Sequence, residues 1–224
     1  MKYNIQFIND YPVIQTRQGM MLIDLGMPIS YCPTGEIDFG NDTHNVEKQF
    51  PMDFSVVNRI IAPEIVGVIG ADLLNQQSTR INYTLQQLET NYHGDDLGIA
   101  THSFSMTGYY GIKLNIGDRE RKVFIDTGAP ISYLLPRIAQ QFPSTRSETD
   151  AGFFNNGQQF QTTLHRATTE FMGQEWDIEY GELPDTYSMI LRMLQIDGVI
   201  GKHFLEKFNI TIRDNTVHCS PVDA

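Results

Sequence analysis

The sequence predicts an all-β protein, mostly strands with short helices, built from two similar halves. A ten-residue stretch, 22–31, recurs at 124–133 with seven of its ten positions identical. A second stretch, 67–74, is followed in the same order by 198–205, and both begin Gly-Val-Ile-Gly. Short apolar or alternating runs, interrupted by Gly, Asn and Asp, fill much of the remainder. Two motifs repeated in the same order indicate an internal duplication.

The first repeated stretch predicts a carboxylate at the end of a buried strand. In each copy two apolar residues precede an aspartate, Asp24 or Asp126, and a glycine follows two positions later. The apolar pair is typical of a core strand, and the glycine lets the chain turn sharply past the acid.

The remaining elements follow from hydrophobic period and turn residues. In the first half we expect strands over 3–8, 11–16, 20–24, 52–61 and 66–69, a strand pair within 80–88, a short hairpin within 31–48 and a helical turn at 71–75. The polar run 91–96 suggests a boundary between a lobe 1–94 and a lobe 95–224. In the second half we expect strands within 104–116 and 122–126, a helix over 135–142, hairpins within 149–163 and 168–178, and closing strands over 208–217.

Composition limits the possible partners and compartments. The chain has 224 residues, 41% of them hydrophobic, and a formal net charge of −11, which argues against nucleic acid and anionic membrane surfaces. There is no long apolar run and no apolar signal-peptide core, so we expect a soluble, cytoplasmic protein and, in addition, a monomer. Cys32 and Cys219 are expected to be free, buried thiols. The histidines show no metal-ligand spacing, so no metal or other cofactor is expected.

Asp-Thr-Gly-Ala at 126–129, followed downstream by an apolar-apolar-Gly, resembles the signature of the pepsin/retropepsin aspartic proteases. The resemblance covers both halves of the chain. It implies two β-barrel-like lobes with a cleft between them, Asp24 and Asp126 facing each other across it, and a peptide or protein as substrate. By the same resemblance, further residues would support the pair of acids, namely Gly26, Gly128, Thr127, Ser30 and Ser132.

Two carboxylates brought together cannot both ionise easily, so the pair holds one proton and titrates in two steps. The charged member can take a proton from water while the protonated member donates to the scissile carbonyl. This chemistry predicts an aspartic endopeptidase. Leu25 stands where the family has Thr or Ser, which leaves open a second interpretation, a catalytically impaired protein that binds peptides.

The sequence also predicts one flap over the cleft, on the second lobe. Val68 follows Asp24 by 44 positions, whereas Val199 follows Asp126 by 73, so only the second interval has room for an extra hairpin. The Asn-Asn-Gly at its centre is a hairpin-turn signal. The alternative is an ordinary surface hairpin whose aromatic residues cover the core. The predicted flap residues are Phe153, Phe154, Asn155, Asn156, Gly157 and Phe160.

Overall fold

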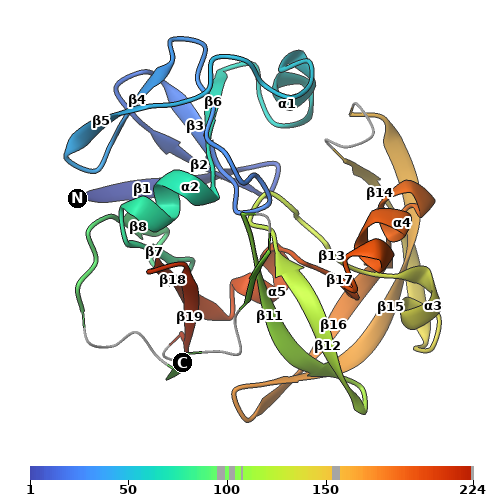
Figure 1. Cartoon of the computed structure of the whole chain (residues 1–224). Coiled ribbons are helices and arrows are strands. Elements are labelled where there is room, and N and C mark those ends of the chain that lie inside the picture. Colours follow the sequence, from blue (N-terminus) through green and yellow to red (C-terminus); the bar gives the residue numbers. More distant parts are fainter. Residues whose placement is uncertain (95–98, 101–103, 107, 153–156, 223–224) are drawn as a thin grey trace.

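A computed structural model describes residues 1–94, 99–100, 104–106, 108–152 and 157–222. As predicted, the chain is mostly β, with two large sheets and short helices (Figure 1). Among the described residues, no helix is both long and apolar enough to cross a membrane.

The first sheet has nine strands in the order β6-β3-β2-β1-β8-β7-β18-β19-β9. Its strands are β1 (Lys2–Ile8), β2 (Tyr11–Gln15), β3 (Met20–Ile23), β6 (Ile65–Ile69), β7 (Thr79–Asn82), β8 (Gln87–Glu89), β9 (Ile99–Ala100), β18 (Phe208–Arg213) and β19 (Thr216–Pro221). The last two strands of the chain, red in Figure 1, therefore lie beside the first half, because β18 pairs antiparallel with β7. The sheet thus crosses the predicted boundary at 94/95.

The second sheet has eight strands in the order β10-β11-β12-β17-β13-β16-β15-β14. These are β10 (Phe104–Met106), β11 (Tyr109–Ile116), β12 (Arg119–Ile125), β13 (Ser132–Leu134), β14 (Ser144–Ala151), β15 (Gln159–Phe171), β16 (Gln174–Glu182) and β17 (Gly198–Ile200). An added pairing between β11 and β15 curls this sheet back on itself. A separate hairpin of β4 (Glu36–Phe39) and β5 (Asp42–Asn45) belongs to the first half.

The helices are α1 (Ser55–Ile60), α2 (Ala71–Gln76), α3 (Pro136–Ala139), α4 (Asp185–Met193) and α5 (Lys202–Leu205). The predicted strand over 52–61 is wrong, because most of it forms α1. Val56, Val57 and Ile61 are buried, a spacing that suits one face of a helix. Asp53 fixes the first turn, accepting hydrogen bonds from the N–H and hydroxyl of Ser55 at 3.0 and 2.7 Å.

The helix predicted over 135–142 is shorter than expected. It ends as α3 at Ala139, and tighter turns follow, in which the N–H of Phe142 donates to the carbonyl of Ala139 at 3.0 Å. Pro143 disfavours helical geometry at Phe142 and has no N–H to bond the carbonyl of Ala139, so the helix does not run through to 142. The hairpin predicted within 168–178 forms around Gly173 from β15 and β16, and β11 and β12 form a further hairpin around Gly117.

The duplicated motifs build the same local structure twice. In the first half β3 runs parallel to β6, with Ile23 opposite Ile69. In the second half β12 runs parallel to β17, with Ile125 opposite Ile200. One continuous hydrophobic cluster contains buried residues from both halves. The core therefore fixes the two strand ends that carry the acids relative to each other. Cys32 and Cys219 are buried and form no disulfide with each other, as expected.

Candidate active site

Asp24 and Asp126 lie side by side where β3 and β12 end. The N–H of Asp24 donates to the carbonyl of Ile69 at 3.0 Å, and that of Asp126 to Ile200 at the same distance. These bonds hold each acid at the end of its parallel strand pair. Asp24 is only 3% exposed, whereas Asp126 is partly exposed.

Each carboxylate packs against the glycine of the opposite motif. A Cβ on Gly26 would lie 2.5 Å from Cγ of Asp126, and one on Gly128 would lie 2.6 Å from Cγ of Asp24. No side chain fits in either gap, so the Asp-x-Gly spacing is needed for the two acids to meet. Each glycine N–H also donates to Oδ1 of the aspartate two residues before it, at 2.7 Å for Asp24 and 2.8 Å for Asp126.

The electrostatics are those of a pair that shares one proton. Burial raises the pKa of Asp24. Burial and the nearby charge of Asp24 together raise the pKa of Asp126 well above its ordinary value. Ionising both would place two negative charges in contact away from bulk water, so one acid stays protonated at mildly acidic pH. The raised pKa values belong to the pair, and Asp24 and Asp126 share the proton.

A single threonine connects the two Asp-Gly turns. The hydroxyl of Thr127 donates to the carbonyl of Ile23 at 2.9 Å and accepts from the N–H of Leu25 at 3.0 Å. Thr127 is 1% exposed and Leu25 is fully buried in the core that spans both halves. Leu25, at the equivalent position of the first half, has no hydroxyl to bond the backbone of the second Asp-Gly turn. These hydroxyl bonds between the two turns therefore come from the second half.

Ser30 and Ser132 are fully buried, and their hydroxyls bond to the second repeated motif of each half. Ser132 Oγ accepts from the N–H of Gly201 at 3.0 Å, and Ser30 Oγ accepts from the N–H of Gly70 at 2.8 Å. Ser30 also donates to Asp72 at 2.5 Å. Both serines tie the loop after the acid to the second repeated motif.

A cleft of about 390 Å³ opens above the two acids and is lined from both halves. Its lining side chains are largely apolar or aromatic, including Tyr11, Met27, Met52, Tyr109, Phe124, Tyr133, Phe160, Leu183, Tyr187 and Leu191. Three aspartates also line it, the third being Asp150 on β14, and no Lys, Arg or His among the described residues does. Such a cleft can hold an extended peptide over the acids and exclude water around them.

The predicted flap hairpin is formed by β14 and β15, and its described parts reach the cleft. Phe160 lines the cleft, together with Ala151 and Gly152. A Cβ on Gly157 would lie 2.9 Å from Cγ1 of Val56, so the hairpin touches α1 of the first half. The other predicted flap residues, Phe153, Phe154, Asn155 and Asn156, lie outside the described residues.

Several cleft residues were not among the predicted site residues. Tyr11 ends the turn after β1, and Asp150 lies on the flap strand without a motif to mark it. Tyr133 is the last residue of the repeated stretch, so the duplication could have drawn attention to it. The cleft-facing residues of α4 repeat at helical spacing, at 187, 190, 191 and 194, which was a readable signal.

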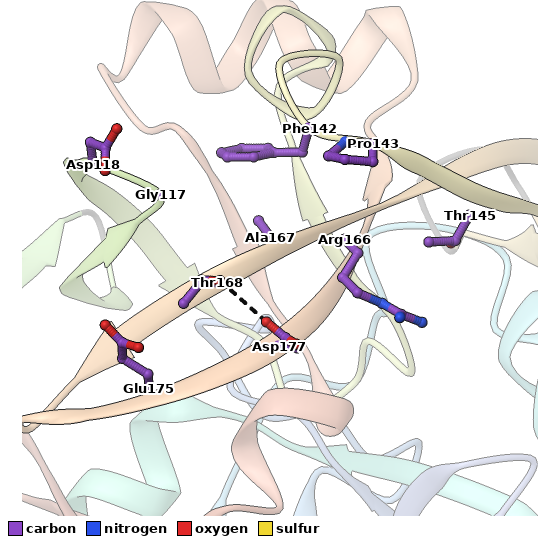
Figure 2. A pocket seen from close by; sticks show the side chains of 10 residues that line it. All are labelled: Gly117, Asp118, Phe142, Pro143, Thr145, Arg166, Ala167, Thr168, Glu175 and Asp177. Carbon is purple, nitrogen blue, oxygen red and sulfur yellow. Dashed lines mark hydrogen bonds between the residues drawn. The ribbon is translucent and has the colours of Figure 1, made fainter.

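A second hollow, of about 590 Å³, lies on the outside of the second sheet and shares no lining residue with the cleft (Figure 2). Several of its polar groups are already engaged. Arg166 pairs with Glu179 at 3.2 Å, and the hydroxyl of Thr168 donates to Asp177 at 3.2 Å. Within the described ranges, no group of three or more His, Cys, Asp or Glu is placed to hold a metal ion.

No protein-family model matches the chain, and no curated protein sequence matches it.

Proposed function

We propose that the chain is an aspartic-type peptidase of the two-lobed pepsin/retropepsin kind, acting on a peptide or protein substrate. The observation that carries the proposal is the meeting of Asp24 and Asp126, each packed against the glycine of the other's motif. The cleft above them and its largely apolar lining support it. In this proposal Asp24 belongs to the first lobe and Asp126 to the second, and β18 and β19 join the lobes.

The reaction follows from one shared proton. A water between the acids attacks the scissile carbonyl carbon, giving a proton to ionised Asp24, while Asp126 gives its proton to the carbonyl oxygen. The resulting diol collapses when Asp24 passes its proton to the leaving nitrogen and a diol hydroxyl returns one to Asp126. The C–N bond breaks, a carboxylic acid and an amine leave, and the pair ends with one proton. The test is hydrolysis of an unfolded protein at mildly acidic pH.

A second candidate is a peptide-binding protein with little or no turnover, and Leu25 is the observation that favours it. The family's two-fold hydroxyl pair would restrain both acids, whereas here only Thr127 does so. A binding protein would hold peptides in the cleft without cleaving the unfolded substrate, which separates the two candidates.

We expect Leu25→Thr to retain or raise activity. A threonine could bond to the backbone of the opposite turn as Thr127 does, restraining Asp126 more tightly. Because Leu25 is fully buried, the smaller side chain should lower the free energy of unfolding by roughly 1–3 kcal/mol. The control is Leu25→Val, which has the shape of threonine without the hydroxyl. The measurement is kcat/KM for both variants, and a threonine variant no more active than the valine variant would contradict the expectation.

We also propose that the β14–β15 hairpin is a flap that closes the cleft against α1. We expect Gly157→Ala to lower kcat/KM severalfold, roughly three- to tenfold, since loops that close a site help to bind substrate and exclude water. Gly157 has φ +70°, and an added Cβ would clash with Val56. Gly173→Ala is the matched control, since Gly173 also has a positive φ, +75°, in a hairpin turn, but its Cβ would meet nothing within 4 Å. Equal activity losses in both variants would mean that backbone strain alone is responsible.

A further inference from the structure

Asp150 is the cleft carboxylate that the proposed chemistry does not use. It is the last residue but one of β14, partly exposed, and it lines the same cleft as the two acids. The hydroxyl of Tyr133 donates to its Oδ2, and the N–H of Ala151 donates to its Oδ1 at 2.7 Å. Both bonds come from neutral groups. They orient the carboxylate and leave its charge uncompensated.

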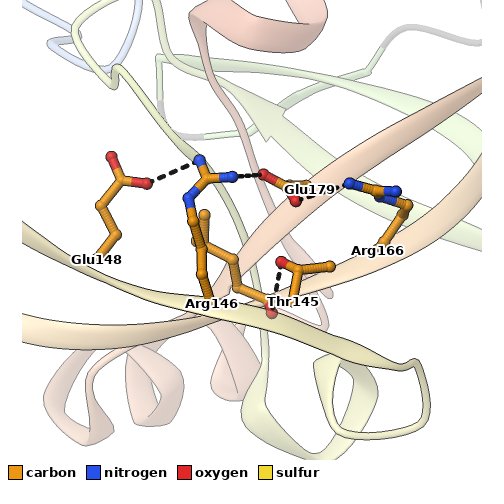
Figure 3. A network of polar contacts seen from close by, with 6 residues as sticks. Thr145, Arg146, Glu148, Arg166 and Glu179 are labelled. Atoms are coloured by element: carbon orange, nitrogen blue, oxygen red, sulfur yellow. Dashed lines mark hydrogen bonds and ion pairs between the residues drawn. The ribbon is translucent and has the colours of Figure 1, made fainter.

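The other charged residues of β14 show that a carboxylate without an ion pair is the exception on this strand. Arg146, Glu148 and Asp150 occupy alternate positions and so share one face of the strand. Away from the cleft, Arg146 lies 3.1 Å from Glu148 and 2.5 Å from Glu179 (Figure 3). Asp150, at the cleft end of the same face, has no ion-pair partner within the described part of the chain. The strand thus pairs its outer acid with Arg146 and leaves the inner one without an ion pair among the described residues.

The cleft as a whole is negative and has an aromatic surface. The dyad keeps about one negative charge when it shares a proton, and Asp150 adds another. Burial and the charge of Asp150 both raise the pKa of Tyr11 and of Tyr133, so that charge acts within the cleft. Tyr133 also packs against Phe160, with ring centroids 6.2 Å apart. A cation is attracted by such a field, and aromatic rings accommodate both its charge and its aliphatic stem.

We propose that the cleft selects peptides carrying a lysine or arginine close to the scissile bond, and that Asp150 binds this side chain as the specificity-determining residue. The inference rests on the proposed peptidase function for its cleavage step only. The cationic group lies between Asp150 and the aromatic side chains of Tyr133 and Phe160. Tyr133 holds the carboxylate in place as a positioning residue.

The test compares two peptides that differ only in lysine against norleucine, which has a similar chain length and no charge. Cleavage is measured as the ratio of kcat/KM values, and binding is measured separately with the full-length Asp126→Asn variant. That variant keeps the cleft charge, because Asp24 alone is then ionised. We expect the lysine peptide to be favoured on the order of tenfold, as for a hydrogen bond to a charged group. The preference should weaken as salt is added.

Asp150→Asn should reduce that ratio to about one, whereas Glu148→Gln, on the same strand face but paired with Arg146, should leave it unchanged. Equal treatment of the two peptides by the wild type, or a preference that survives Asp150→Asn, overturns the inference. So does a failure of the lysine peptide to bind. Binding with the lysine preference but without cleavage would defeat the peptidase proposal and leave Asp150 as the specificity residue of a binding cleft.

Discussion

Asp126→Asn should abolish peptide hydrolysis, with kcat/KM falling by a factor of about a thousand or more, and leave the fold intact. The amide cannot give up the proton that the scissile carbonyl oxygen needs, and general acid–base groups contribute roughly a hundred- to ten-thousandfold. The amide oxygen can still accept the hydrogen bond from the N–H of Gly128, which in the wild type lies 2.8 Å from Oδ1 of Asp126. Asp24→Asn should do the same by removing the group that accepts the proton of the water.

The matched control is Asp177→Asn, a carboxylate in the hollow outside the second sheet, which should keep full activity. Unfolding measured against pH provides a second readout. The folded-state pKa of Asp126 is raised, so the wild type loses stability as the pH rises from the ordinary aspartate pKa through the raised one. The Asp126→Asn variant keeps only the loss that comes from the burial of Asp24, and should be at least as stable as the wild type at neutral pH. Unchanged turnover in either dyad variant would place the chemistry elsewhere.

The sequence could predict the strands that carry the acids because their signals are local. Two apolar residues, an aspartate and a glycine make the same strand end in both halves, and the duplication supported the interpretation twice. The strand prediction for the segment that forms α1 was wrong because its apolar residues suit a strand as well as a helix. The contacts of Asp53 with Ser55, which fix the first helical turn, are seen only in the structure. The pairing of β18 with β7 joins positions more than a hundred residues apart, for which no local pattern exists.

The cleft itself was less predictable than the acids. The role of Thr127 depends on which backbone groups lie opposite, and the sequence could only show that Leu25 lacks a hydroxyl. Asp150 has no motif, and its place in the cleft arises from the register of β14 against β15, which sets it opposite Phe160. Such roles become visible only when the strand register and the packing of the two halves are known.

Thr127→Val should destabilise the fold by roughly 2–4 kcal/mol and lower kcat by about tenfold or more, because it removes two buried hydrogen bonds at once. Valine keeps the shape of threonine, so the change isolates the hydroxyl. The N–H of Leu25 would lose its acceptor at 3.0 Å, and the carbonyl of Ile23 would lose its donor at 2.9 Å. The measurements are denaturant unfolding and kcat on the same preparation.

Thr127→Ser is the control, because it keeps the hydroxyl and loses only one methyl group, for about 1 kcal/mol. Its activity should stay near that of the wild type. Because Leu25 supplies no hydroxyl, Thr127 alone makes the hydroxyl contact between the two Asp-Gly turns, and nothing on the opposite side can replace it. The valine variant should therefore lose far more activity than Leu25→Val, which removes packing but no hydrogen bond. Similar activity losses for those two variants would show that core packing, rather than the hydroxyl, aligns the two carboxylates.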